Sequence, residues 1–313
     1  MRAATCADPG QPLSAPQEEV LEAAWHIPDY RLDLTLECGQ TFRWHRFGRG
    51  WLGVIEGRRV ELVQAGTLFT ARLWGRTQDL TRLENYLQIR TSLEAICATF
   101  PDDPHLHEAI RRWHGLRLLR QPAWECLASF LLSSAKQIVQ ICQVIERICR
   151  RWGRPVPGPA TGPRLWSFPS PERLAAASES ELRACGAGFR APFLLAAARA
   201  VADGKLPLDD LPHRPYEEAR ERLLTLPGVG PKIADCVCLF GLGFLEAFPV
   251  DTWVKRVMQE RYFGGRPVSE EVVARFGRRH FGRYAGYAQQ YLFHDRRVGG
   301  GVFRPHQPGP STA

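Results

Sequence analysis

The stretch Leu226–Cys236, "LPGVGPKIADC", decides the predicted fold of this chain. It places a Gly-x-Gly turn directly before a proline and a lysine, and the residues from Pro231 onward are typical of a first helical turn. The preceding segment, "PYEEARERLLTL", has the apolar spacing of an amphipathic helix. Two helices joined by so short a turn form a helix–hairpin–helix, in which Gly228 and Gly230 let the backbone take positive φ angles and approach a ligand closely.

The turn has a binding interpretation and a purely structural one. If the amides of Gly228, Val229 and Gly230 point outward with those of the second helix, they form a phosphate site that needs no base contacts. Such a site fits sequence-independent binding to a nucleic-acid backbone. Alternatively, the glycines only close a tight interhelical turn, and the short motif alone does not separate the two interpretations.

Lys232 occupies an unfavourable place for a cation. The amino end of a helix carries partial positive charge, which disfavours a cation by roughly 0.3–1 kcal/mol. The chain also hardly uses lysine, because among its 41 basic residues the only lysines are Lys136, Lys205, Lys232 and Lys255. A solvated surface charge is the usual role of a single lysine, but lysine can lose its proton and attack an electrophile, whereas arginine effectively cannot. We therefore predict that Lys232 is a nucleophile.

The composition indicates a globular protein with a polyanionic partner. Hydrophobic residues make up 44% of the 313 positions and charged residues 24%. The net charge of +8 and the pI near 9.2 favour nucleic acid as the partner. Nine scattered cysteines, with no Cys-x-x-Cys pair, indicate reduced thiols in an intracellular protein. No signal peptide and no membrane span are predicted.

The pattern of the chain changes once, near residue 77. From 31 to 74, short segments such as "RLDLTLEC" and "RRVELVQAG" alternate with glycine turns, which predicts an antiparallel sheet. Later segments such as "PHLHEAIRRWHGL" have helical spacing. The predicted fold class is therefore α+β, with an N-terminal antiparallel β-sheet domain followed by a mainly helical domain that holds the helix–hairpin–helix motif. Expected bounds are 22–115 and 116–298, with tails at 1–21 and 299–313.

The order of motifs carries a resemblance to a known family. "LPGVGPKIADC" is followed by "PVD", which places Asp251 19 residues after Lys232, and this pairing resembles the helix–hairpin–helix base-excision glycosylases. "CGQTFRW", "GFRAPF" and "YAGYAQQYLF" are similar to the 8-oxoguanine DNA glycosylases in particular. The similarity runs from about Arg31 to Phe293, which is most of the chain.

The resemblance implies a base-removing chemistry. The damaged nucleotide rotates out of the duplex into a pocket. Lys232 then attacks the anomeric carbon, and the resulting Schiff base permits β-elimination on the 3′ side. The helix end and partial desolvation should both favour the neutral amine of Lys232. Asp251 is a helix N-cap by position, and the resemblance adds the stabilisation of positive charge on the sugar, for which Asp235 is the weaker competitor.

The resemblance also implies how 8-oxoguanine is recognised. Gly39 in "CGQTF" matches the family residue whose backbone carbonyl accepts the hydrogen on N7 of the oxidised base, where guanine has an acceptor instead. Gln289 is implied to pair with the Watson–Crick edge, and Phe293 and Cys236 to cover the two faces of the base. Without the resemblance, Gly39 is a turn residue, and Phe293 and Cys236 are core.

Phe189 and Arg190 follow a glycine-rich turn in "GAGFRAPF". An exposed aromatic side chain at such a turn can wedge into the gap left by a flipped base. Arg190 would then donate to the orphaned partner base, as its family counterpart does to cytosine. The alternative is a buried phenylalanine that begins a helix.

The segment "SSAKQIVQI" departs from the family pattern. Lys136 and Gln140 are assigned to DNA binding in it, but Ala135 stands where an asparagine is expected and Gln140 where an arginine is expected. A methyl group cannot hydrogen-bond cytosine, so the preference for cytosine opposite the lesion is predicted to be weak. Trp253 replaces a histidine of the better-known members, with no predicted consequence.

The favoured function is a bifunctional 8-oxoguanine glycosylase and AP lyase in base-excision repair. One alternative is a glycosylase for another damaged base on the same scaffold, and another is a non-catalytic helix–hairpin–helix DNA-binding protein. The expected partner is double-stranded DNA containing an oxidised purine, bound by a monomer that has no membrane contact. No cofactor is expected, because the nucleophile is a side chain. No metal ligands are assigned, and the sequence leaves open whether the carbonyls of the hairpin bind a cation. The expected compartment is the cytoplasm or nucleoid of a bacterium, or the nucleus of a eukaryote.

Overall fold

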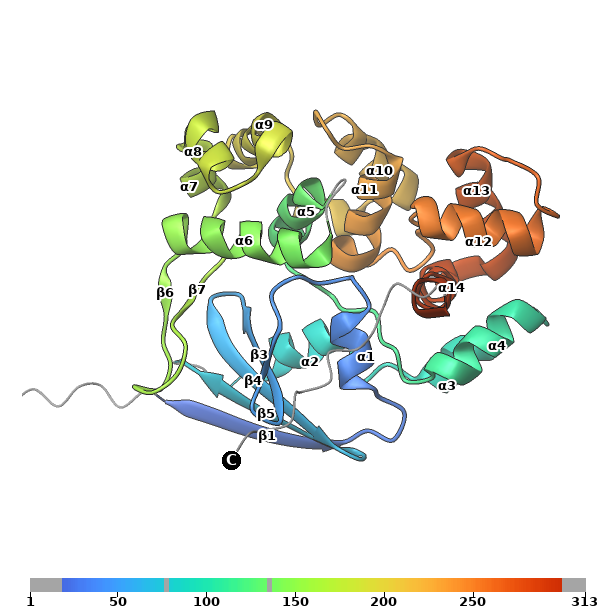
Figure 1. The fold of residues 1–313 in the computed structure, drawn as a ribbon, viewed down its shortest axis with the longest axis horizontal. Helices are drawn as coiled ribbons and strands as arrows, with labels where there is room; N and C mark the ends of the chain where they lie inside the picture. The colour runs from blue at the N-terminus through green and yellow to red at the C-terminus, as the bar shows by residue number, and fades with distance from the viewer. Residues whose placement is uncertain (1–18, 76–78, 134–136, 300–313) are drawn as a thin grey trace, which may run out of the picture.

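The computed structural model describes residues 19–75, 79–133 and 137–299. Figure 1 shows a twisted sheet on one side of the molecule and a layer of helices on the other. The predicted α+β fold class is confirmed, with the sheet before the helices in chain order.

The sheet contains five antiparallel strands in the order β1-β5-β4-β3-β2. The strands are β1 (Val20–His26), β2 (His45–Phe47), β3 (Gly50–Ile55), β4 (Arg58–Ala65) and β5 (Leu68–Trp74). At its centre Leu62 pairs with Trp51 on one side and Ala71 on the other, and all three are buried. The buried side chains of the sheet pack with those of α2 (Thr81–Leu87) into one hydrophobic core. The first strand begins at Val20, two residues before the predicted start of the domain at 22.

The prediction of a strand for "RLDLTLEC" is wrong, because this segment forms the helix α1 (Leu32–Glu37). Its leucines alternate with polar residues, which matches the period of a strand. In the fold, however, Thr35 is buried together with the leucines on either side of it. A helix this short has too few turns to show its own period, so tertiary packing decides its structure.

The remaining helices form the second layer and its connections. They are α3 (Leu93–Cys97), α4 (Pro104–Trp113), α5 (Ala123–Leu132), α6 (Ile138–Trp152), α7 (Pro171–Ala175), α8 (Glu179–Ala184), α9 (Ala191–Ala202), α10 (Tyr216–Leu224), α11 (Pro231–Val237), α12 (Thr252–Tyr262), α13 (Glu270–Phe281) and α14 (Ala285–Gly299). The capping box predicted at Ser178 and Glu181 is confirmed at the start of α8. The proline-rich segment predicted as a loop contains one small hairpin, β6 (Pro155–Val156) with β7 (Leu165–Trp166).

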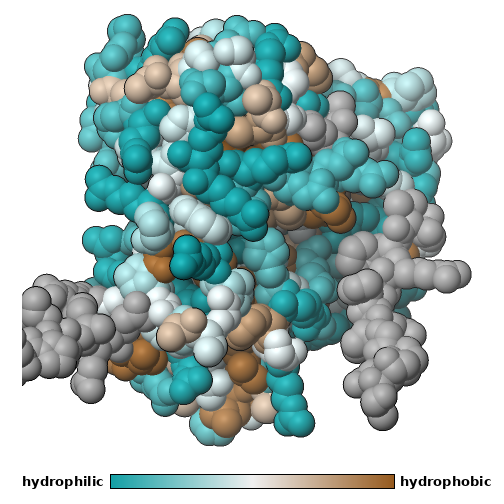
Figure 2. Space-filling model, turned by 60° about the vertical axis from the view of Figure 1, so that its left-hand side comes forward, coloured by the Kyte–Doolittle hydropathy of each residue, from teal (hydrophilic) through white to brown (hydrophobic). Residues whose placement is uncertain are grey.

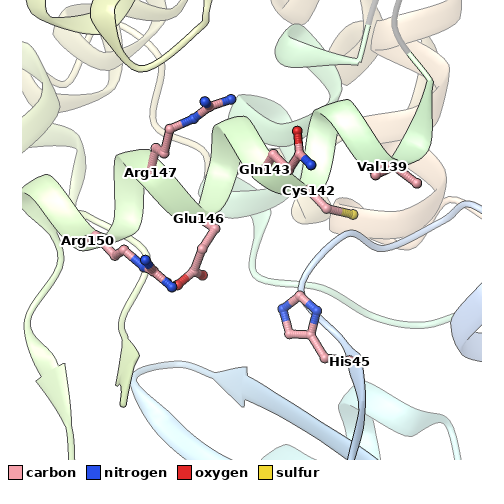
Figure 3. A pocket seen from close by; sticks show the side chains of 7 residues that line it. All are labelled: His45, Val139, Cys142, Gln143, Glu146, Arg147 and Arg150. Atoms are coloured by element: carbon pink, nitrogen blue, oxygen red, sulfur yellow. The ribbon is translucent and has the colours of Figure 1, made fainter. Parts of the chain in front are cut away.

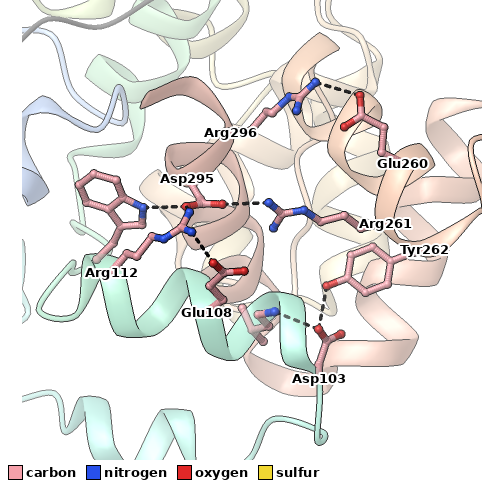
Figure 4. Close-up of polar contacts among 10 residues, drawn as sticks. Asp103, Glu108, Arg112, Glu260, Arg261, Tyr262, Asp295 and Arg296 are labelled. Atoms are coloured by element: carbon pink, nitrogen blue, oxygen red, sulfur yellow. Dashed lines mark hydrogen bonds and ion pairs between the residues drawn. The ribbon is translucent and has the colours of Figure 1, made fainter. Parts of the chain in front are cut away.

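Helix α14 is fixed by a polar network that joins it to α4 and α12 (Figure 4). The buried carboxylate of Asp295 accepts hydrogen bonds from Trp113 Nε1, Arg112 Nη1 and Arg261 Nη2, each at 3.1 Å. Asp103 caps α4 by accepting from the Leu106 amide at 2.9 Å, and it also accepts from the Tyr262 hydroxyl at 3.1 Å. Thus α4, which the sequence assigns to the sheet domain, is hydrogen-bonded to α12 and α14 of the helical domain.

Candidate active site

The predicted helix–hairpin–helix is formed by α10, a tight turn and α11. Gly228 has a φ of +81°, and a Cβ at this position would lie 2.4 Å from the ring of Phe193, so only glycine fits. Gly230 has a φ of −92° and a ψ of 177°, so it does not use the positive φ that a glycine permits. It is the N-cap of α11 in extended geometry, a conformation that any residue adopts. Between the two glycines, Val229 is buried and anchors the turn.

Beside the hairpin lies a cavity of about 560 Å³. It is lined by Gly39, Phe42, Phe130, Ser133, Gln137, Ile138, Val139, Ile141, Lys232, Asp251, Trp253, Phe293 and Arg297. These residues come from the loop after α1, from α5 and α6, and from the starts of α11 and α12 and the end of α14. The structure therefore brings four of the predicted site residues to one cavity: Gly39, Lys232, Asp251 and Phe293.

Lys232 is the second residue of α11, as predicted, and its side chain is directed to the cavity rather than to bulk solvent. Its Nζ lies 3.4 Å from Ser133 Oγ and 5.2 Å from the ring centroid of Phe130. The amine thus contacts the hydroxyl of Ser133 and the ring face of Phe130, and neither of these groups is an anion. Such surroundings keep an amine within reach of a ligand and do not lock it into an ion pair.

Asp251 is the N-cap of α12, and its Oδ1 accepts from the Val254 amide at 2.8 Å, which confirms the predicted cap. Burial raises the pKa of this carboxyl above its ordinary value. The Val254 amide and the positive charges of Lys232 and Arg297 act in the opposite direction, without cancelling the effect of burial. The carboxylate is thus electrostatically coupled to the lysine across the cavity.

Gly39 and Phe293 meet at the far wall of the cavity. Gly39 has a φ of +89°, and a Cβ built on it would lie 3.7 Å from Phe293 Cε1 and 2.8 Å from Arg297 Nη1. Both the backbone conformation and the crowding require glycine. The loop after α1 and helix α14 are therefore in direct contact at this point.

Cys236 and Gln289 are buried and do not line the cavity themselves. Burial raises the pKa of the Cys236 thiol to about 12, with the charge of Lys232 acting in the opposite direction. Gln289 precedes Phe293 by one helical turn on α14. Within the described ranges its Oε1 is buried without a hydrogen-bond partner. A buried carbonyl oxygen without a hydrogen-bond donor destabilises the folded protein, which points to a donor supplied by a ligand.

Phe189 is 57% exposed, so the alternative of a buried phenylalanine is wrong. The next residue, Arg190, is buried, and its guanidinium carbon lies 4.2 Å from the centroid of the Phe189 ring. The turn therefore presents the aromatic ring outward and keeps the arginine folded against it.

The segment after Ser133 is described only in part. Lys136 and Ala135 lie outside the described residues. Gln140 is exposed, and its Oε1 accepts from the Gln137 amide at 3.3 Å in the capping box that begins α6. From Val139, which lines the candidate cavity, a second hollow continues along α6 past His45 (Figure 3).

Sequence reasoning missed Arg297, which lines the cavity beside Gly39 and lies 5.4 Å from the centroid of the Phe293 ring. A signal for it exists in the sequence. Gln289, Phe293 and Arg297 are spaced four residues apart and so lie along one face of a helix. Ser133 was missed as well, and no spacing links it to Lys232.

Few large hydrophobic side chains are exposed among the described residues, and the face in Figure 2 is mainly hydrophilic. No helix within the described ranges is both long and apolar enough to pass through a membrane. In the same part of the chain, no cluster of histidine, cysteine and acidic side chains could hold a metal ion.

A helix–hairpin–helix whose second helix presents a lysine to a cavity shared with an N-cap aspartate defines the class of helix–hairpin–helix base-excision DNA glycosylases. Comparisons with known families agree. Residues 26–127 match the 8-oxoguanine DNA glycosylase N-terminal domain, and residues 128–279 match the HhH-GPD superfamily of base excision DNA repair proteins. The chain belongs to the 8-oxoguanine DNA glycosylase family.

Individual relatives support the same assignment over most of the chain. A probable N-glycosylase/DNA lyase of Methanothermobacter thermautotrophicus is 32% identical, over 87% of this chain and 96% of that protein. The N-glycosylase/DNA lyase OGG1 of Arabidopsis thaliana is 31% identical, over 90% of this chain and 85% of that protein. A solved structure of Clostridium acetobutylicum 8-oxoguanine glycosylase/lyase, bound to double-stranded DNA with cytosine opposite 8-oxoguanine, has a TM-score of 0.84. It is 30% identical and covers 91% of this chain and 98% of that chain.

Proposed function

We propose that this chain excises 8-oxoguanine from duplex DNA and then cleaves the strand at the resulting site, with Lys232 as the nucleophile of both steps. The observation that carries the proposal is the convergence of Lys232, Asp251, Gly39 and Phe293 on one cavity from four separate parts of the chain. A DNA-binding module without catalysis would have no need of this convergence.

The chemistry begins with an attack of the neutral Lys232 amine on C1′ of the flipped nucleotide. The bond between C1′ and N9 breaks, and the departing base keeps the electron pair and takes up a proton. The sugar ring opens to a protonated Schiff base on Nζ. Loss of a proton from C2′ then expels the 3′ phosphate, which completes β-elimination. Asp251, ionised beside the same carbon, stabilises the positive charge that develops on the sugar.

Recognition of the base is assigned to the opposite wall of the cavity. The carbonyl of Gly39 accepts the N7 hydrogen of 8-oxoguanine and repels the N7 lone pair of guanine. Phe293 stacks on one face of the base. Cys236 and Gln289 are buried and do not line the cavity, so the base must displace part of the lining before Cys236 closes its other face. The unpaired Oε1 of Gln289 accepts from the Watson–Crick edge, which supplies the donor that it lacks in the free protein.

DNA contact is assigned to the hairpin and to two turns. The amides of Gly228, Val229 and Gly230 bind a phosphate, and the exposed ring of Phe189 fills the gap left by the flipped base. Arg190 must leave the ring of Phe189 before it can reach the orphaned partner base. Lys136 and Gln140 remain candidates for the same strand. The protein is proposed to act on duplex DNA as a monomer. Its proposed compartment is the one that holds the genome, which is the nucleoid in a bacterium and the nucleus in a eukaryote.

A panel of duplexes tests the substrate. Each duplex carries one lesion, 8-oxoguanine, an alkylated purine or a deaminated base, and base release is measured under single-turnover conditions. The proposal expects 8-oxoguanine to be released fastest. Faster release of an alkylated base would assign the chain to a different lesion on the same scaffold. No release of any base would contradict the glycosylase assignment.

A further inference from the structure

The loop after α1 is held by three side chains, each on a different backbone carbonyl. Arg297 Nη2 donates to the Glu37 carbonyl at 2.6 Å, and Gln290 Nε2 donates to the Cys38 carbonyl at 3.1 Å. On the other side of Gly39, Gln121 Nε2 donates to the Gln40 carbonyl at 2.7 Å. Among the residues that the structure describes, no donor reaches the Gly39 carbonyl itself. The carbonyls on both sides of the recognition carbonyl are therefore fixed, while that carbonyl stays available.

Two of these three donors lie on α14, the helix that also carries the base-facing residues. Gln290 and Arg297 are seven residues apart and so lie on one side of the helix, two turns from each other. Arg297 is buried, and its guanidinium carbon lies 5.4 Å from the centroid of the Phe293 ring. One helix thus sets the separation between the stacking ring and the carbonyl that faces N7.

The position of Arg297 also suits the end of α1. Glu37 is the last residue of that helix, and the carbonyls of a helix C-terminus lack intrahelical donors and carry partial negative charge. A buried guanidinium at this place makes a charge-assisted hydrogen bond, which is stronger than one between neutral groups. The bond fixes the direction in which the chain leaves α1 and enters Gly39.

We propose that Arg297 is a positioning residue for base recognition: by holding the Glu37 carbonyl, it aims the Gly39 carbonyl at N7 and so sets the selectivity for 8-oxoguanine. This inference rests on the proposed function. The contact at N7 discriminates by direction, because a carbonyl turned away neither rewards the N7 hydrogen nor repels the guanine lone pair. Selectivity is then lost before the chemistry at Lys232 is affected.

An opposite role for Arg297 is conceivable on chemical grounds. Arginine commonly donates to N7 of unmodified guanine. If Arg297 contacted the base in that way, it would weaken the discrimination, and its removal would improve it. The two roles predict changes of opposite sign, so one experiment separates them.

The experiment compares two activities of the same variants. The first is single-turnover release of 8-oxoguanine, which needs base recognition, and release of guanine from the undamaged duplex is measured beside it to give the selectivity. The second is β-elimination at a preformed abasic site, which needs Lys232 but no base. In Arg297→Met the side chain keeps its length and loses its donors, so release should fall about tenfold. Strand cleavage at the abasic site should stay within about twofold of the unmodified protein. Arg297→Lys keeps one donor and should recover part of the loss.

Arg296→Met is the matched control. Arg296 is next to Arg297 in the sequence, but its guanidinium pairs with Glu260 Oε1 at 2.8 Å, away from the loop after α1. Both activities of this variant should therefore be unchanged. Equal loss of both activities in Arg297→Met, unchanged activities, or a higher selectivity would each overturn the inference. If Arg297→Met does not fold, the ratio of the two activities in Arg297→Lys decides in the same way. If the unmodified protein releases no 8-oxoguanine, the proposed function fails instead, and the two failures stay distinct.

Discussion

At the scale of single residues, Asp251 has to meet two demands that differ in their dependence on protonation. As the cap of α12 it only needs an oxygen that accepts from the Val254 amide, and a neutral acid or an amide would serve. As a stabiliser of positive charge on the sugar it must be ionised. Because burial raises the pKa of this carboxyl, the ionised form that catalysis needs is held at a cost in folding free energy.

The pH dependence of activity follows from this raised pKa. As pH falls, Asp251 takes up a proton before an ordinary aspartate does, so the part of the base-release rate that depends on its charge should be lost at a pH above the ordinary aspartate pKa. A rate-against-pH profile under single-turnover conditions measures it. An acidic limb at or below the ordinary aspartate pKa would contradict the expectation.

Asp251→Asn separates the two demands. Asparagine is as good an N-cap as aspartate, so the fold should be kept, while the rate of base release should fall roughly 100-fold because the charge is gone. A raised folded-state pKa contributes stability below the unfolded pKa, and this contribution is lost as pH rises through the folded value. The variant should therefore be at least as stable as the parent at neutral pH, as measured by urea unfolding. A clear loss of stability at neutral pH would show that the charge is needed structurally.

The positions of the functional side chains were predictable from the sequence where they depend only on residues nearby in the chain. The place of Lys232 at a helix start and the cap at Asp251 both follow from a few neighbouring letters. The contacts of Lys232 with Ser133 and Phe130 do not, because those residues come from α5, about a hundred residues earlier. Gly230 shows the same limit, because its sequence permits a positive φ that the fold does not use. A glycine in a motif indicates permission for that conformation and no more.

At the scale of elements, α14 links recognition to stability. One side carries Gln289, Phe293 and Arg297, and the side that packs against α4 and α12 carries the buried Asp295, which these helices hold through three hydrogen bonds. Any loosening of α14 would move the stacking ring relative to Gly39. The helix itself was predictable from "YAGYAQQYLF", but its partners α4 and α1 were not, because long-range packing has no local signature.

Asp295→Ala tests this linkage. Removal of the carboxylate leaves the partly buried donors of Trp113 and Arg261 and the half-exposed guanidinium of Arg112 without this acceptor, which should cost about 2 kcal/mol in the free energy of unfolding. Urea unfolding measures this change. Asp102→Ala is the control, because the Asp102 side chain is fully exposed and its contact with the half-exposed His107, at 3.6 Å, is a surface pair whose loss should have little measurable effect.

The pH dependence of the stability difference between the parent protein and Asp295→Ala is a second test. Burial alone would raise the pKa of Asp295, but its donors Trp113, Arg261 and Arg112 lower it below the ordinary value. A lowered pKa contributes stability above the unfolded pKa, and this is lost as pH falls through the folded value. The difference in stability between parent and Asp295→Ala should therefore shrink at acidic pH. A difference that does not depend on pH would contradict the assigned role.

At the scale of the whole molecule, two regions that fold around separate cores meet at one cavity. The sheet and α2 form one core, and the later helices form the other. The α+β class and the order of the two regions were predictable, because strand and helix periods differ along the chain. The short helix α1 was mistaken for a strand, and it is the element that delivers Gly39 to the second region. The division at residue 115 stays a prediction.

The opposite strand of the duplex is where this chain is predicted to differ from its family. Ala135 cannot hydrogen-bond cytosine, and Gln140 is engaged in capping α6. We expect release of 8-oxoguanine to be comparable opposite cytosine and opposite adenine. A preference for cytosine of about a hundredfold or more would contradict this expectation, since it requires base-specific contacts of several kcal/mol.

The central claim is that Lys232 forms a covalent bond with the sugar. Borohydride reduces a Schiff base to a stable amine, so a duplex with one 8-oxoguanine should be trapped on the protein, and peptide mapping should place the adduct on Lys232. Lys232→Gln should give no adduct while it still binds the duplex. An adduct on another residue, or undiminished trapping in Lys232→Gln, would contradict the account.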